Sequence, residues 1–341
     1  MQVSPDQNLN TSRALRAGLL SGLLGLIVIV LVTLAVGRSA IDVDALTAIA
    51  SRTRIWLMVV SLFVMSMAFW FLGLRWRSLL PGETRPPGIG LAAILCAGLL
   101  LNSALPGPVG EFGAAWFAHK RYRVSLGMSL AAGMGSRIIG MIVATMAAFL
   151  CFVLAEPPIP EEYRGIIGAT ACLVGLMGLG LLVVITRPSL MATISDLTLG
   201  RVGRFQGLHK VVVEAANGLQ TLKTHGLRAF VHCALWSVVA HSTVLLGIFI
   251  AAWSLGADPS VPGLLFTYAT TTAAVIVMFA LPGSQVGWDA IFLTLLTTTA
   301  GLAMPDALAV AIVVRIQQLC IMGAGAAALA WLARTNPPSE E

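Results

Sequence analysis

The sequence predicts an all-α, polytopic membrane protein with six full transmembrane helices and two re-entrant hairpins in an inverted repeat. Three observations lead to this prediction. Of the 341 residues, 57% are hydrophobic and only 11% are charged, whereas soluble proteins average about 25% charged residues. Several apolar runs have the length that crosses roughly 30 Å of hydrocarbon as a helix. Two further apolar runs each end in Leu-Pro-Gly, which breaks a helix.

The apolar runs that are long enough to span a bilayer predict helices. They lack the alternation of apolar and polar residues that a membrane β-barrel requires. The first run follows Arg13 and Arg16 and is longer than the apolar region of a cleavable signal peptide, so we interpret it as an uncleaved span. The six runs cover residues 17–36, 55–74, 125–154, 165–185, 228–254 and 305–333.

The basic segments predict the orientation of the spans. Lys and Arg are concentrated in cytoplasmic loops. With the N-terminus in the cytoplasm, Arg75, Arg77 and Arg85 follow two crossings, and the basic loop 186–227 follows four. Both segments then lie on the cytoplasmic side. The sequence therefore predicts a multi-pass protein of the inner (cytoplasmic) membrane, with both termini in the cytoplasm.

Two shorter apolar runs, 89–104 and 261–281, predict the re-entrant hairpins. The basic stretch "AHKRYR" follows the first run, so the segment 89–118 is expected to enter from the cytoplasm, turn and return. By the same logic the second hairpin enters from the outer side. The residues predicted to break these hairpins are Pro106, Gly107, Pro108 and Gly110 in the first and Pro282, Gly283 and Gly287 in the second.

The two halves of the chain share one order of elements, which predicts an inverted repeat. Each half has two spans, a broken hairpin and a span with a single arginine, Arg137 or Arg315. Because each half crosses the membrane three times, the second half would be upside down relative to the first, as in secondary transporters. Chance similarity of two apolar halves is the alternative. The predicted single membrane domain covers residues 13–334, with repeat A at about 13–154 and repeat B at about 165–334.

Two polar regions lie outside the predicted bundle. The segment 205–224 carries its apolar residues on one helical face, which predicts a helix lying on the inner leaflet or, alternatively, one packed against the bundle. The last residues, 335–341, are expected to form a disordered tail.

Four ionisable residues are predicted to lie at membrane depth: Glu111, Arg137, Asp289 and Arg315. Charged groups there are costly and are by default candidates for function. Each acid follows a hairpin break, so the hairpin tips are expected to bring the two acids together with the two arginines. Salt bridges that only lock the repeats together are the alternative. Further polar side chains predicted for this translocation site are Asn102, Ser136, Gln285, Trp288 and Gln318.

The first hairpin also predicts an anion site. A helix that starts at Glu111, after "PGPVG", would direct its free N–H groups toward the hairpin tip and attract an anion. With Arg137 and Arg315 this arrangement suits a phosphate. His241 lies within a span and is open to two interpretations, a proton relay or a histidine bonded to a neighbouring helix.

No cofactor or metal is predicted. The five cysteines lie in or beside apolar runs, and none forms a Cys-x-x-Cys pair. The chain also has no Gly-x-Ser-x-Gly, no His-Glu-x-x-His and no aspartate cluster that could hold Mg²⁺. We therefore expect a protein that is not an enzyme.

The motifs resemble a known family. "LPGPVGEFGAAWFAHKR", followed by a span with Arg137, and "LPGSQVGWDAIF", followed by "ALAVAIVVRIQQ", are similar to the lysylphosphatidylglycerol synthase transmembrane, or flippase-like, family. That family typically has an arginine where this chain has Ala114 and Ala115, and a glutamate near Trp288 and Asp289. Nothing follows the last span that could be the soluble aminoacyl-transferase domain of bifunctional members, so lysyl transfer is not expected.

The resemblance implies a lipid flippase or translocator. The lipid would be an anionic phospholipid, a polyprenyl phosphate or a hopanoid or glycolipid, and its headgroup would pass through the polar site at the hairpin tips. The alternatives are a non-transporting scaffold of a lipid-biosynthetic complex, assembled through faces such as "GLMGLGLL", and an enzyme acting on lipid phosphates. The expected partner is a membrane lipid. Lipid-biosynthetic enzymes and further copies of this chain are possible additional partners. No nucleic acid is expected.

Overall fold

The computed structural model describes residues 43–81, 86–104, 109–198, 206–223, 226–278 and 284–334, and every element in these ranges is a helix. Among them, five helices are long and apolar enough to cross a membrane. These are α3 (Ile55–Ser78), α6 (Leu126–Leu154), α7 (Glu161–Thr186), α10 (Leu227–Ser254) and α13 (Met304–Arg334).

Five of the six predicted spans are thereby confirmed, and the sixth, 17–36, lies outside the described residues. The helix ends follow local chemistry. Ser125 caps α6 by accepting a hydrogen bond from the Met128 amide at 3.4 Å. Gly226 precedes α10 with φ of +81°, a conformation that glycine adopts at little cost. The starts of α6 and α10 are therefore bounded by residues suited to a helix end.

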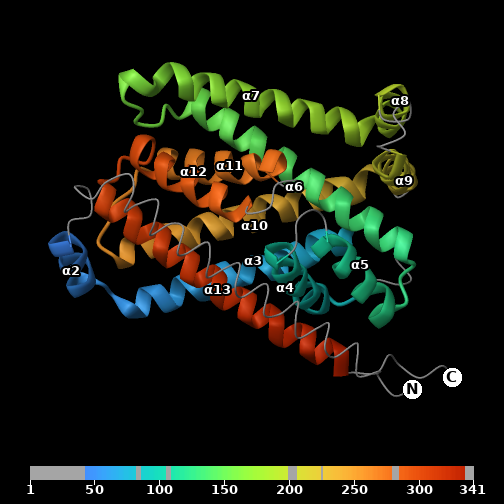
Figure 1. Ribbon diagram of the computed structural model, residues 1–341, viewed down its shortest axis with the longest axis horizontal. Helices are drawn as coiled ribbons and strands as arrows, with labels where there is room; N and C mark the ends of the chain where they lie inside the picture. The colour runs from blue at the N-terminus through green and yellow to red at the C-terminus, as the bar shows by residue number, and fades with distance from the viewer. Residues whose placement is uncertain are drawn as a thin grey trace.

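The two broken apolar segments each form a pair of helices. The first pair is α4 (Gly88–Ala104) and α5 (Val109–Tyr122), and the second is α11 (Val261–Met278) and α12 (Ser284–Thr298). The helices of each pair pack against each other. Figure 1 shows α4 and α5 in one half of the bundle and α11 and α12 toward its opposite end.

Three short helices lie outside the long ones: α2 (Val43–Arg52), α8 (Pro188–Thr198) and α9 (Gln206–Lys223). Figure 1 shows α8 and α9 nearly end-on beside the end of α7, across the direction of the long helices. The predicted helix at 205–224 is α9, and its buried Leu219 and Leu222 pack on Gly135 of α6. The prediction that α9 packs against the bundle is therefore confirmed for the face that carries Leu219 and Leu222. Helices α2 and α8 were not predicted.

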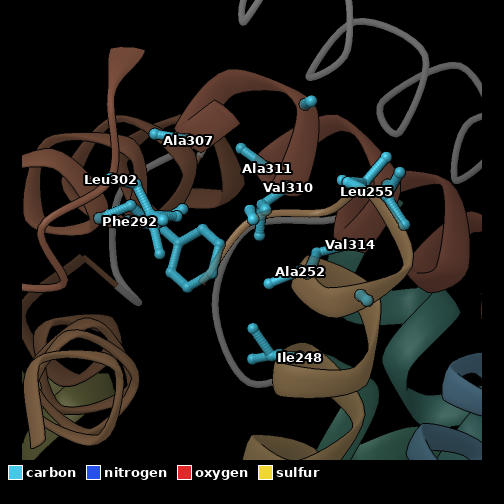
Figure 2. Packing of buried hydrophobic residues seen from close by; sticks show 14 of the residues in the cluster. Ile248, Ala252, Leu255, Phe292, Leu302, Ala307, Val310, Ala311 and Val314 are labelled. Carbon is cyan, nitrogen blue, oxygen red and sulfur yellow. The ribbon is translucent and has the colours of Figure 1, made fainter. Parts of the chain in front are cut away.

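Helix α13 is the most buried of the five candidate spans. In its apolar window 61% of the residues are buried, against 22–33% in the other four candidate spans. Figure 2 shows its Val310 and Val314 in one cluster with Ile248 of α10 and Phe292 of α12. Helices α3, α6, α7 and α10 instead expose many large apolar side chains, as helices facing lipid do.

A buried polar link joins α3, α10 and α13. The Ser61 hydroxyl donates to the Gly247 carbonyl at 2.7 Å, and Gln317 Nε2 donates to the Ser61 oxygen at 2.9 Å. All three groups are buried, and a polar group in an apolar interior is stable only when it is hydrogen-bonded. This link fixes α13 against the α3 and α10 pair.

Candidate functional site

Glu111 and Arg137 form an ion pair that joins α5 to α6. The sequence predicted that a helix begins at Glu111, but α5 begins at Val109, so Glu111 lies in its first turn. A carboxylate in that position is stabilised by the positive end of the helix dipole. The Glu111 side chain is 15% exposed and that of Arg137 is 31% exposed, so this pair is only partly enclosed.

Asp289 and Arg315 form the corresponding ion pair between α12 and α13. Their side chains are only 3% and 2% exposed. Arg315 also donates from Nη1 to Gln318 Oε1 at 2.9 Å, so the predicted site residue Gln318 lies beside the pair. Two charges taken out of water need such close pairing and additional hydrogen bonds to be stable.

The two ion pairs occupy equivalent places in the two halves of the chain. In each, an acid near the start of the second helix of a broken pair binds an arginine within the following long helix. The sequence identified all four residues, and the structure decides which acid binds which arginine. Each ion pair lies within one half of the sequence.

Two other predicted site residues take part in packing. The Ser136 hydroxyl is buried and donates to the Gly133 carbonyl of its own helix at 2.9 Å. The Trp288 ring stacks on Phe292, with 4.6 Å between the ring centroids. Both lie next to a residue of an ion pair in the sequence, and their observed contacts are those of helix packing.

The predicted hairpin breaks are only partly described. Gly110 is buried at the start of α5, and a β-carbon at Gly98 of α4 would lie 3.0 Å from its carbonyl oxygen, so the two helices approach closely there. Gly287 lies in α12. The side chains of Asn102 and Gln285 lie outside the described residues, as do all atoms of Pro106, Gly107, Pro108, Pro282 and Gly283.

His241 in α10 bonds to two neighbouring helices. Its Nε2 lies 3.0 Å from the Gly140 carbonyl of α6, and its Nδ1 lies 2.8 Å from the Tyr268 hydroxyl of α11. Because a carbonyl only accepts, Nε2 carries the proton, and in a neutral ring Nδ1 then accepts from the hydroxyl. The interpretation of His241 as a histidine bonded to neighbouring helices is confirmed.

A cavity of about 130 Å³ lies beside this histidine, between α6, α10 and α11. His241, Ser242 and Tyr268 supply its polar groups, and the rest of its wall is apolar. The apolar lining residues are Val143, Ala144, Ala147, Val238, Leu245, Leu265 and Ala269.

Arg75 belongs to the same region, although the sequence placed it among the cationic loop residues. Its guanidinium lies against Gly140, where a β-carbon would overlap Nη1 and would be 3.6 Å from Nε2 of His241. Arg75 is also within electrostatic reach of Arg137. One signal was available: Gly140 follows Arg137 by one helical turn on the same face and leaves room for a large side chain. No pattern in the sequence identifies which side chain fills that room.

The region around α6 therefore combines two guanidinium groups, the Glu111 carboxylate and His241 inside an apolar bundle. Guanidinium groups bind carboxylates and phosphates through paired hydrogen bonds. Such a site can hold an anionic group or keep it neutralised within the membrane.

Comparison with known protein families identifies the family of this chain. Residues 19–325, nearly the whole chain, match the family described as the lysylphosphatidylglycerol synthase TM region, which confirms the resemblance of the motifs. No curated protein and no solved structure matches the chain at a significant level.

Proposed function

Because the chain belongs to the lysylphosphatidylglycerol synthase TM region family, we propose that this membrane protein is a lipid flippase or translocator. The lipid headgroup would pass through the polar site while its acyl or isoprenoid chains stay in the bilayer. The observation that carries this proposal is the repeated ion pair, an acid from each broken helix pair bound to the arginine of the next long helix.

The proposal includes the inverted repeat with two re-entrant hairpins. It is supported by the equivalent places of the two ion pairs and by the positions of α4 with α5 and α11 with α12 toward opposite ends of the bundle (Figure 1). Polar groups of a broken helix are stable at membrane depth only inside protein or beside water, so hairpin tips are natural places for a polar path.

The proposed orientation places both termini in the cytoplasm of a cell with an inner membrane. Basic residues gather at the end of α7 that would face inward. Arg187 follows α7 directly, and Lys223 at the end of α9 donates from Nζ to the Thr186 carbonyl. Basic groups beside a span favour the cytoplasmic side. A membrane lipid is the proposed partner, together with lipid-biosynthetic enzymes that supply it.

A scaffold role through "GLMGLGLL" is less well supported. Gly175 and Gly178 of this stretch face α6 within the chain, where a β-carbon would press against Phe149 and Thr145. These glycines therefore serve helix packing inside the protein. We propose accordingly that the protein transports its lipid and does not act on it chemically.

Reconstitution tests the proposed transport. Purified protein in liposomes would be given fluorescent phospholipid or polyprenyl phosphate, and a membrane-impermeant reductant would report the fraction of label in the outer leaflet. The assay would run with and without an imposed proton gradient. Wild-type protein should move lipid between leaflets, and Glu111→Ala and Arg137→Ala should abolish the movement. Arg77→Ala, an exposed change at the end of α3, serves as the matched control.

The result that would contradict the proposal is equally specific. If Glu111→Ala and Arg137→Ala move lipid as fast as Arg77→Ala while remaining folded by size-exclusion chromatography, the ion pairs have no part in transport. If wild-type protein moves neither lipid class under either condition, the transport proposal itself fails.

A further inference from the structure

We propose that Arg75 and Arg137 together bind the phosphate group of the transported lipid, beside the cavity lined by His241 and Tyr268. This inference rests on the proposed function, because it names the chemical class of the substrate, a lipid with a phosphate in its headgroup. It also adds Arg75 to the site that the sequence predicted around Arg137.

Arg75 lies near the C-terminal end of α3, and its side chain extends from there into the bundle. Arg75 lies in the last turn of α3, and long helical side chains point back toward the N-terminus of their helix. A β-carbon placed on Gly140 would overlap Nη1 of Arg75 and would lie 3.2 Å from its Cζ. Gly140 and His241 are both near the middle of long apolar helices. The guanidinium therefore lies at membrane depth.

The charges around α6 do not balance among the described residues. Arg137 is paired with Glu111, whereas Arg75 forms no ion pair within the described part of the chain. The Nε atom of Arg75 is buried and has no hydrogen-bond partner there. Arginine stays protonated in proteins, so a positive charge is left over between two guanidinium groups that repel each other.

The groups that face Arg75 do not supply the missing negative charge. Among the described residues, Cys233 and His241 of α10, Tyr268 of α11 and Arg137 of α6 interact electrostatically with Arg75, and none of these four is a carboxylate. An apolar interior favours the neutral form of His241, in which Nδ1 accepts from Tyr268, and this form adds no positive charge. An anion from outside the described protein would complete the site, and a phosphate matches the fork of a guanidinium group.

The adjoining cavity favours a lipid as the source of the phosphate. It shares His241 and Tyr268 with the surroundings of Arg75, and its remaining wall is mostly apolar. A phosphate held by two arginines next to an apolar cavity places a charged headgroup beside room for the first part of a chain. Free phosphate would use the cationic part of the site alone.

Lipid binding in detergent micelles tests this proposal without any transport step. The full chain would be titrated with dioleoyl phosphatidylglycerol or with dioleoylglycerol, which has the same chains and no phosphate, and bound lipid would be counted by native mass spectrometry. Wild-type protein should prefer the phospholipid. Arg75→Gln should weaken phospholipid binding about 10- to 100-fold, the effect of losing a charged hydrogen-bonding group, and should leave dioleoylglycerol binding unchanged. Arg77→Gln, an exposed change on the same helix, should bind both lipids as wild type does.

A second variant and a competitor make the outcomes distinct. Arg75→Lys keeps the charge and should retain part of the phospholipid preference, which covers the case in which Arg75→Gln does not fold. Equal phospholipid affinity in Arg75→Gln and Arg77→Gln, or parallel loss of both lipids, would overturn the proposal. Displacement of the phospholipid by millimolar inorganic phosphate would assign the site to free phosphate and overturn the lipid assignment. Because micelles have no leaflets, binding can hold even where the transport assay fails.

Discussion

Replacing Asp289 by asparagine is expected to destabilise the protein far more than replacing Glu111 by glutamine. The two substitutions differ because the Asp289 and Arg315 pair is more deeply buried than the Glu111 and Arg137 pair. The side chains of Asp289 and Arg315 are 3% and 2% exposed, so Asp289→Asn leaves a positive charge buried without its carboxylate. Removing one partner of a buried pair costs about 3–5 kcal/mol. Glu111 and Arg137 are 15% and 31% exposed, so their separation is expected to cost only about 1–2 kcal/mol.

The double variant Asp289→Asn with Arg315→Gln separates the cost of losing the ion pair from the cost of leaving one buried charge unpaired. Once both charges are removed, no unpaired charge remains, and the cost should fall to about 1 kcal/mol or less. Equilibrium unfolding of purified protein by sodium dodecyl sulfate in mixed micelles, followed by circular dichroism, measures all of these free energies. The four proteins of the Asp289 and Arg315 cycle give the coupling energy directly.

Two results would refute this reasoning. If Asp289→Asn costs no more than Glu111→Gln, the enclosure of the second pair does not set its energy. If the double variant is as unstable as the single variant, the loss comes from packing and not from an uncompensated charge. Size-exclusion chromatography in detergent would confirm that each variant is folded before unfolding is measured.

Four further substitutions can be measured by the same unfolding assay. Gly140→Ala should destabilise the protein by about 1–3 kcal/mol, because the added methyl group would overlap the Arg75 guanidinium. Gly165→Ala, with no atom within 4 Å of the added carbon, should stabilise α7 by about 0.5–1 kcal/mol, and similar values for the two changes would contradict the packing. Gln317→Leu should cost about 1–3 kcal/mol, since its Nε2 donates to α3 at 2.9 and 3.3 Å; a neutral effect would show that this polar link is dispensable. Arg52→Ala should change stability by less than about 1 kcal/mol, because its salt bridge is exposed, and a larger loss would mean that α2 is held by that contact.

The short helices show where the sequence was least informative. Helix α8 begins at Pro188, and proline is favoured at the first position of a helix, so this start signal was present in a loop interpreted only by its charge. Helix α2 has no long apolar run and packs against α13. Short amphipathic helices depend on the surface that they cover, which a single sequence does not reveal.

The sequence predicted most residues of the candidate site, but it did not predict which of their side chains are in contact. Glu111, Arg137, Asp289 and Arg315 stand out because a charge within an apolar run is rare and costly. The same rule overlooked Arg75, since it lies at the end of its run, where a basic residue usually marks the cytoplasmic side. Only its contact with Gly140 shows that the side chain turns back into the bundle.

The sequence by itself determined that the chain is helical and crosses a membrane, and it located five long helices to within four residues at each end. This was possible because the lipid core imposes a length of apolar helix that can be counted along one segment. The tertiary structure decided which acid binds which arginine, that α13 is the most buried candidate span, and where the Arg75 guanidinium is held. These features depend on how helices distant in the sequence pack side by side, and side-chain packing is set by the shapes of several surfaces at once.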